Sequence, residues 1–181
     1  MNQTSSSKNA PDRHGISLVI SHWSLVIFLT LPLYALDQIT KRWIVSNFDP
    51  DSTTMQVIPG WFNIVYVTNT GAAFGSFKNS NSFFVAISAV TLLALIVFHL
   101  RGSFRDLWSR AGAALLMAGI LGNLTDRLLY RHVVDFLDFD LHVRFANPWP
   151  SFNVADSCIC IAVGMFLIAS ILEEKRKKPK S

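Results

Sequence analysis

Acidic side chains recur in this sequence at the edges of long apolar stretches, where a charge is costly. The segment GNLTDRLLYRHVVDF at 122–136 contains Asp126 and Asp135, and FNVADS at 152–157 contains Asp156. Carboxylates at such a boundary need partners or a chemical role. When two carboxyl groups share a site, one keeps a proton, and the pair can then act as acid and base.

The local pattern does not decide which acids would share a site. VVDFLDFD at 133–140 offers three of them, namely Asp135, Asp138 and Asp140. Asp156 has a structural alternative, because Asn153 can cap a helix in which Asp156 is the third residue. We expect Asp135 to lie in an irregular segment.

Two further segments carry polar groups at helical spacing. In DQITK, Asp37 precedes Lys41 by one helical turn, which is the favourable order for an ion pair. In GNLTDR, Asn123 and Asp126 share one helix face and the adjacent Arg127 points elsewhere. The structural alternatives are an ion pair that marks the end of a membrane span and a polar clasp between spans.

A small polar segment, NTGAA, follows a stretch that predicts a β-hairpin. Alternating apolar residues over 62–66, after a Pro-Gly pair, are typical of a short hairpin, which we expect on the outer membrane surface. Asn69 and Gly71 begin the small segment, and small residues allow close approach of another chain. The segment is either an ordinary loop or one wall of a peptide-binding cleft.

Metal and serine-nucleophile chemistry fit the sequence poorly. The His residues are scattered at 14, 22, 99, 132 and 142, without metal-ligand spacing. Neither H-E-x-x-H nor G-x-S-x-G occurs. We therefore expect no metal and no cofactor.

The elements that must position these groups are membrane spans. The chain is 51% hydrophobic and 15% charged, with a mean hydropathy of +0.36, which is apolar for a soluble domain. Four stretches have the length and composition of transmembrane helices, at about 16–36, 82–100, 111–130 and 157–172.

Positive charge gathers on one side of this four-span arrangement. The N-terminal tail, the loop between the second and third spans, and the C-terminal tail hold ten Lys and Arg against four acids, whereas the other side holds six against eight. The positive-inside rule predicts that both termini are cytoplasmic, which puts the candidate acids at the outer face. The basic tail is typical of a lipid-headgroup anchor rather than a nucleic-acid site. A small transporter with proton-relaying acids would instead carry them near span centres.

In order along the chain, the motifs DQ-x-T-K, N-x-GAAF-G, GN-x-x-DR, V-V-DF and FN-x-ADS resemble those of the lipoprotein signal peptidases (signal peptidase II). The resemblance implies an aspartic endopeptidase whose catalytic pair is Asp135 and Asp156. It implies supporting or substrate-binding roles for Asp37, Lys41, Asn69, Gly71, Asn123, Asp126, Arg127 and Asn153. The main departure is the polar N-terminal tail.

The same resemblance implies a fold, a substrate and a location. The fold is an all-α integral membrane protein of four transmembrane helices, with a small extracytoplasmic β-sheet and a short outer helix or loop. The substrate is a prolipoprotein whose lipobox Cys carries diacylglycerol, cleaved just before that Cys by water that the two Asp residues activate. We expect a monomer in the bacterial inner membrane that contacts lipid and no nucleic acid. A transporter or a structural membrane adaptor is the alternative class.

The sequence therefore predicts three segments along the chain. Residues 1–15 form a polar cytoplasmic tail, residues 16–172 form the four-helix peptidase domain with outer loops at about 43–81 and 131–153, and residues 173–181 form a basic cytoplasmic tail.

Overall fold

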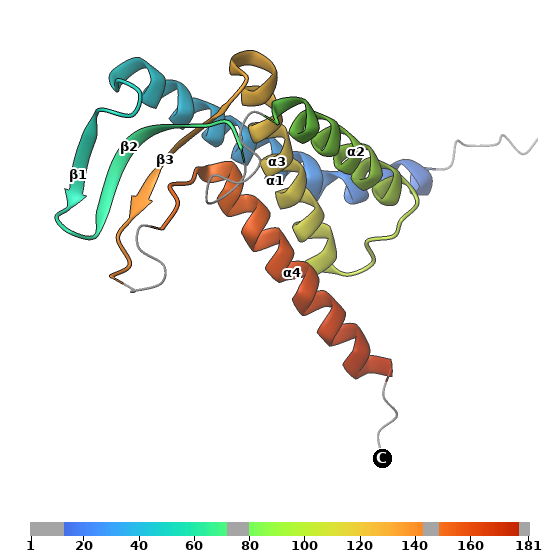
Figure 1. The fold of residues 1–181 in the computed structure, drawn as a ribbon. Helices are drawn as coiled ribbons and strands as arrows, with labels where there is room; N and C mark the ends of the chain where they lie inside the picture. The colour runs from blue at the N-terminus through green and yellow to red at the C-terminus, as the bar shows by residue number, and fades with distance from the viewer. Residues whose placement is uncertain (1–12, 72–79, 143–148, 178–181) are drawn as a thin grey trace, which may run out of the picture.

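The computed structural model describes residues 13–71, 80–142 and 149–177, with side chains described from residue 23 to residue 175 outside the two gaps. These residues form four long helices and a three-stranded antiparallel sheet at one end of the helices (Figure 1). The helices are α1 (Arg13–Asn47), α2 (Asn81–Leu100), α3 (Leu107–Tyr130) and α4 (Val154–Lys177). The strands are β1 (Thr54–Ile58), β2 (Phe62–Asn69) and β3 (Val133–Phe139).

All four helices are long and apolar enough to cross a membrane, as the sequence predicted. Large apolar side chains cover their outer surfaces, and Phe28, for example, is 79% exposed. Such continuous apolar exposure fits a surface that faces lipid.

The first helix is longer than the membrane span predicted within it. It continues past Leu36 to Asn47, so Asp37 and Lys41 lie inside the helix. The connection to β1 begins after Asn47.

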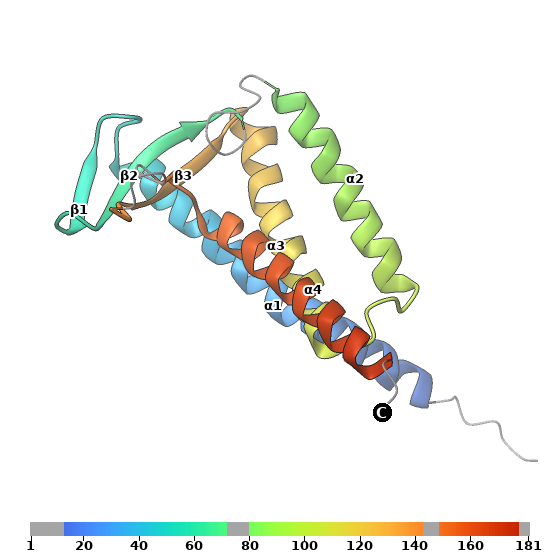
Figure 2. The same ribbon diagram turned by 60° about the horizontal axis from the view of Figure 1, so that its bottom comes forward.

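Small residues make α3 the central helix of the bundle. Gly119 and Gly122 face neighbouring elements so closely that a Cβ on Gly119 would collide with the carbonyl oxygen of Ala155, and one on Gly122 would lie 2.5 Å from Asp37 Oδ2. Figure 2 shows α3 between α2 on one side and the crossing pair α1 and α4 on the other. This close packing brings polar residues of three helices together.

The ends of α3 follow from local side-chain chemistry. Asp106 caps its start by accepting hydrogen bonds from the backbone N–H groups of Trp108 and Ser109, at 2.9 and 3.0 Å. Arg131 ends the helix with a positive φ of 66°, the left-handed conformation common after helices. The chain then turns directly into β3.

The sheet has the strand order β1-β2-β3. The predicted hairpin is confirmed as β1 and β2, joined through a turn with Gly60 at φ +75°. The expectation of an irregular segment around Asp135 was wrong, because Val133–Phe139 pairs antiparallel with β2. Ile44 and Phe48 at the end of α1 pack against Tyr66, Val134 and Phe136, which fixes the sheet to the bundle.

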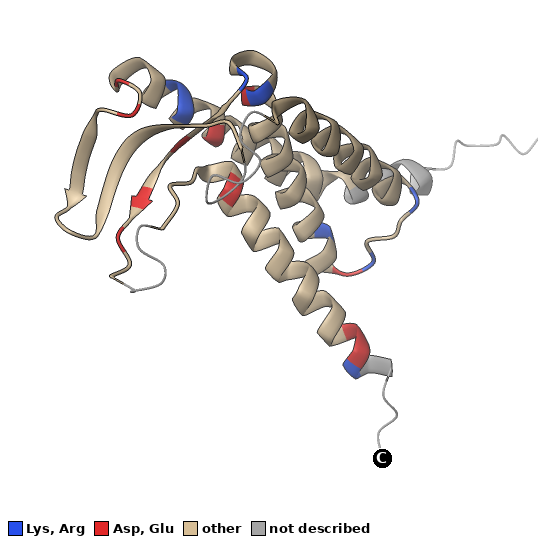
Figure 3. Ribbon diagram, in the orientation of Figure 1, with Lys and Arg blue, Asp and Glu red and all other residues tan. Residues whose placement is uncertain are grey.

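Acidic groups gather at the sheet end of the molecule, around β3 and the start of α4 (Figure 3). The start of α1, the loop between α2 and α3, and the end of α4 lie at the other end (Figure 2). The short outer helix implied by the resemblance is not among the elements of the described residues, and the connections 72–79 and 143–148 lie outside them.

Candidate active site

A cavity of about 1260 Å³ lies between the sheet and the ends of α2, α3 and α4. Apolar side chains such as Phe84, Ile120 and Ile159 form much of its wall. Seven of the polar, charged and glycine positions named from the sequence also line it: Asn69, Gly71, Asn123, Arg127, Asp135, Asp138 and Asp156. An apolar cavity with a few convergent polar groups is the usual form of a binding or active site.

Asp135 lies in β3 with only 2% of its surface exposed. The Asn69 side chain donates to its Oδ2 at 2.9 Å, and the Asn153 side chain donates to its Oδ1 at 2.7 Å. Asn69 lies in the neighbouring strand β2, and Asn153 is the residue just before α4. The pairing of β2 with β3 and the position of Asn153 at the start of α4 therefore place an amide on each oxygen of this carboxyl group.

Asp156 lies in the first turn of α4, and the predicted capping arrangement is confirmed. Asn153 Oδ1 accepts from the backbone N–H of Asp156 at 2.9 Å, and Asp156 Oδ2 accepts from the backbone N–H of Asn153 at 3.2 Å. Asn123 on α3 donates its side-chain N–H to Asp156 Oδ1 at 2.8 Å. The cap thus orients a carboxylate that also faces the cavity.

Asn153 links the two carboxyl groups, since its side chain reaches Asp135 while its backbone N–H binds Asp156. Burial and, after it, the nearby charge of Asp156 raise the pKa of Asp135 from 3.8 to about 7, against the opposing effect of the hydrogen bonds from Asn69 and Asn153. A carboxyl group with this pKa exchanges a proton near neutrality. The arrangement is suited to general acid–base chemistry.

Lys41 neutralises a second group of carboxylates beside this pair. Its ammonium lies 2.9 Å from Asp37 Oδ2, 2.9 Å from Asp126 Oδ2 and 3.0 Å from Asn123 Oδ1. All three charged side chains are at most 3% exposed. The predicted Asp37–Lys41 ion pair is confirmed, and Lys41 also bridges α1 to α3.

The same two carboxylates also hold the backbone of the site. Asp37 Oδ1 accepts from the N–H of Ala155 at 2.8 Å, at the start of α4. Asp126 Oδ2 accepts from the N–H of Val134 at 3.2 Å, next to Asp135 in β3. The backbone of β3 is thus held at Val134, just before Asp135, and the backbone of α4 is held at Ala155, just before Asp156.

Arg127 lies apart from Asn123 and Asp126, as its position on the helix predicted. Its guanidinium lies 4.9 Å from the centre of the Phe84 ring and donates to the carbonyl oxygen of Gly71 at 3.4 Å. Asn69 Oδ1 accepts from the N–H of Gly71 at 3.0 Å. Asn69 and Arg127 therefore hold this backbone at the cavity wall, and the residues that follow, from 72 to 79, lie outside the described residues.

The structure separates the three acids that the local pattern left equivalent. Asp138 reaches the same cavity but accepts from Asn63 at 3.0 Å and from Ser151 at 3.3 Å, at the far end of β3. Asp140 does not line the cavity and lies 3.4 Å from His142. Only Asp135 shares a bridging amide with Asp156.

Sequence reasoning missed Gln38 and the 149–152 segment. Gln38 donates its side-chain N–H to both Asp37 and Asp126, at 3.2 Å each. Phe152 bridges to Leu137 in β3, and this contact brings residues 149–152 to the cavity. A polar residue beside Asp37 could have indicated the role of Gln38, whereas no local pattern indicated that residues 149–152 reach the cavity.

Together, these features define a polytopic membrane protein with an acidic, amide-lined cavity at one end of its bundle. A family model described as signal peptidase (SPase) II matches residues 29–172. The chain therefore belongs to the signal peptidase II family, whose members are membrane proteases. This membership excludes the transporter and adaptor alternatives as the primary class.

Curated relatives cover most of the chain. A lipoprotein signal peptidase of Thermodesulfovibrio yellowstonii is 39% identical over 156 residues, which are 86% of this chain and 99% of the relative. One from Symbiobacterium thermophilum is 36% identical over 152 residues, 84% of this chain and 97% of that protein. A solved bacterial membrane enzyme is 32% identical with a TM-score of 0.75, covering 93% of this chain and 95% of its own.

Proposed function

We propose that this chain is an aspartic endopeptidase that removes signal peptides from diacylglyceryl-modified prolipoproteins, cleaving just before the lipid-modified Cys. Asp135 and Asp156 are its catalytic pair. The observation that carries the proposal is that these two carboxyl groups face one cavity and are linked by Asn153, with amides rather than a cation as their nearest partners. Membership of the signal peptidase II family supplies the substrate class.

In the proposed reaction, Asp156 is the base and Asp135 the acid. Ionised Asp156 takes a proton from a water molecule, and the resulting hydroxide attacks the scissile carbonyl carbon. Protonated Asp135 donates a hydrogen bond to the carbonyl oxygen as negative charge develops there. Collapse of the tetrahedral intermediate breaks the C–N bond, the amine leaves with a proton passed on by the pair, and the signal peptide keeps the new carboxylate.

The raised pKa of Asp135 supports this division of roles, because a carboxyl group must hold its proton near neutrality to act as the acid. The position of Asp156 in the first turn of α4 supports the other half, since free backbone N–H groups there favour negative charge. The pair shares its titration, so the assignment concerns where the proton mainly resides.

Three amides and one guanidinium position the reacting groups in this proposal. Asn69, Asn123 and Asn153 fix the two carboxyl groups. Arg127 and Gly71 present a wall against which an extended peptide backbone can lie. No cofactor or metal enters any step.

The same proposal includes an orientation in the bacterial inner membrane. Both termini face the cytoplasm, and the cavity opens at the outer face, where a substrate anchored by its diacylglycerol presents the bond. The uneven distribution of Lys and Arg supports this orientation. We propose that a single chain acts as a monomer.

The test is cleavage by purified protein of two versions of one precursor. The first carries diacylglycerol on the lipobox Cys, and the second has the same sequence without the lipid. We expect a single cut before the Cys in the lipidated precursor and little or none in the other. Equal cleavage of both would refute the proposed role of the lipid, and cleavage elsewhere would refute the proposed bond.

A further inference from the structure

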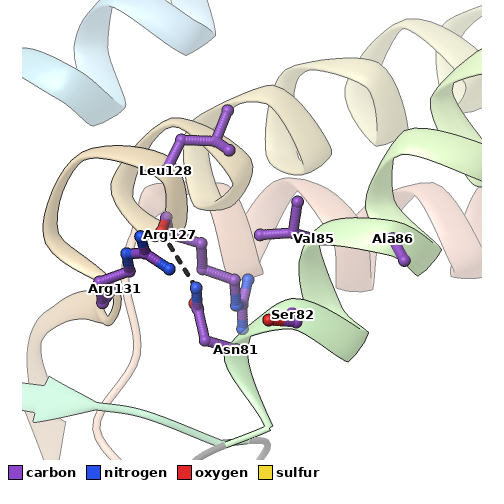
Figure 4. Close-up of a pocket in the computed structure, with 7 residues that line it drawn as sticks. All are labelled: Asn81, Ser82, Val85, Ala86, Arg127, Leu128 and Arg131. Carbon is purple, nitrogen blue, oxygen red and sulfur yellow. Dashed lines mark hydrogen bonds between the residues drawn. The ribbon is translucent and has the colours of Figure 1, made fainter.

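A second cavity, of about 270 Å³, lies where α2 begins and α3 ends. Arg127 and Arg131 from the end of α3, and Asn81 and Ser82 from the start of α2, form its polar part (Figure 4). Arg127 lines the larger cavity as well, so its side chain stands between the two. Nothing in the proposed cleavage reaction uses this second cavity.

Its two guanidinium groups lack a carboxylate partner within the described residues, where the ion pairs all involve Lys41 or His142. Outside the described residues, the sequence contains one acid, Asp12. Asp126, Asp135 and Asp156 attract Arg127 at longer range, but their own hydrogen bonds hold them on the other side.

Further donors surround these charges. The Asn81 side chain donates to the carbonyl oxygen of Arg127 at 3.3 Å, which ties the two helix ends together (Figure 4). Ser82 adds a hydroxyl group. Ser80 makes no side-chain cap hydrogen bond at the start of α2. The polar part of the cavity thus offers donors and positive charge without an internal acceptor that matches them.

The other walls of the cavity are apolar and belong to the lipid-facing surface. Val85 and Leu128 line it, and Leu128 is 61% exposed. The positively charged part of the cavity wall therefore continues into apolar helix surfaces that run along the bilayer. A free anion would contact only the first part, whereas a phospholipid would contact both.

We propose that this cavity binds the phosphate group of an anionic phospholipid, with Arg131 and Arg127 pairing the phosphate oxygens and the acyl chains lying along α2 and α3. Arginine pairs phosphate through two parallel N–H groups, and a bilayer surface supplies phosphate at this depth. The same lipid would hold Arg127 in position at the edge of the peptidase cavity.

The test measures lipid binding through the unfolding temperature of purified protein in detergent, since a ligand that binds the folded state raises it. Phosphatidylglycerol is titrated against phosphatidylcholine, and glycerol 3-phosphate is the soluble phosphate. The variants are Arg131→Gln, which removes one guanidinium, and Ser82→Asp, which puts a carboxylate in the cavity at a helix start that tolerates it. Arg105→Gln removes the same charge from the exposed loop before α3 and serves as the matched control.

We expect phosphatidylglycerol to bind the unchanged protein at least about ten-fold more tightly than phosphatidylcholine, because both carry the phosphate but phosphatidylcholine also carries a quaternary ammonium that the two guanidinium groups repel. Arg131→Gln and Ser82→Asp should each remove most of that preference, while Arg105→Gln keeps it. Equal binding of the two lipids by the unchanged protein, or equal losses in Arg105→Gln and Arg131→Gln, would overturn the proposal. Stabilisation by glycerol 3-phosphate equal to that by phosphatidylglycerol would assign the cavity to a soluble phosphate instead of a lipid.

Discussion

Two groups of carboxylates lie side by side at the sheet end of this molecule, and they differ in how their charge is compensated. Asp37 and Asp126 share the ammonium of Lys41, and each also accepts a hydrogen bond from a backbone N–H group. Asp135 and Asp156 have amide partners and face a cavity. Asn123 joins the groups, because it accepts from Lys41 and donates to Asp156.

The difference separates a structural role from a chemical one. Buried carboxylates that share a cation and accept hydrogen bonds from backbone N–H groups fix the elements that carry those groups, and removing the cation is strongly destabilising. A buried carboxyl group held only by amides keeps a raised pKa and remains able to give and take a proton. We infer that the Lys41 group holds β3 and α4 in place, and that the Asp135–Asp156 pair does the chemistry.

The largest expected effect is on activity when either member of the pair is changed. Asp135→Asn and Asp156→Asn should each lower the rate of precursor cleavage by about 10³-fold or more, because an amide can replace neither acid nor base. The unfolding temperature should not fall. Asp138→Asn is the matched control in the same cavity, and we expect its rate to stay within a few-fold; a large loss there with Asp135→Asn active would move the pair.

Removing the cation of the other group should act through stability. Lys41→Met leaves Asp37 and Asp126 buried without compensation, which typically costs about 3–5 kcal/mol. We expect poor folding in the membrane, measured as protease sensitivity and a lowered unfolding temperature, with activity lost in proportion to folded protein. Complete inactivation of Lys41→Met at an unchanged unfolding temperature would show a direct role in chemistry and break the comparison.

The contact between α3 and α1 gives a smaller effect. In Gly122→Ala the new Cβ would lie 2.5 Å from Asp37 Oδ2 and 2.9 Å from the Cβ of Ala155. Such overpacking usually costs about 1–3 kcal/mol, and it should lower both stability and activity by moving the start of α4. Gly164→Ala is the matched control, because a Cβ there meets nothing within 4 Å and the helix should gain slightly. Equal effects of the two substitutions would refute the claim that α3 needs a small residue at position 122 to pack closely against its neighbours.

The smallest effect concerns pH. Since Asp135 must be protonated and its pKa is raised to about 7, kcat/KM should fall as the pH rises through about 7. The hydrogen bond from Asn69 lowers this pKa, so Asn69→Ala should raise it and move the alkaline limb to higher pH. A limb that stays in place or moves to lower pH in Asn69→Ala would remove Asp135 as its source.

Folding stability should show the same carboxyl group. The pKa of Asp135 is about 7 in the folded protein and 3.8 without its environment, so folding favours the protonated form. Its contribution is complete below about pH 4 and is lost as the pH rises through about 7. At pH 8, Asp135→Asn should therefore unfold at a higher temperature than the unchanged protein, and a lower temperature would contradict the burial argument.

Local pattern was enough for the helices, the hairpin and two of the contacts. Apolar length predicted the four spans, alternation predicted β1 and β2, and spacing predicted the Asp37–Lys41 pair and the Asn153 cap. Each of these depends on residues close together in the chain. The naming of Asp135 over Asp138 and Asp140 came from the resemblance to a family, because the three acids look alike locally.

The features that the sequence did not predict depend on contacts between residues that are far apart in the chain. Val133–Phe139 is a strand because β2 and Phe152 pair with it, and its own acids interrupt the apolar alternation. Lys41 contacts Asp126 and Asn123 on α3, and the spacing of Asp37 and Lys41 in the sequence does not reveal these partners. The side chain of Asn153 reaches Asp135 across 18 positions, which no spacing rule anticipates.

The most direct test of the central claim is the protonation state of Asp135 in the folded protein. Carbon-edited NMR of labelled Asp, assigned with Asp135→Asn and Asp156→Asn, follows each carboxyl group with pH. The account predicts that Asp135 is mainly protonated at about pH 6 and loses its proton near pH 7. An Asp135 carboxyl group that is already ionised at pH 6, with its ordinary pKa of 3.8, would contradict it.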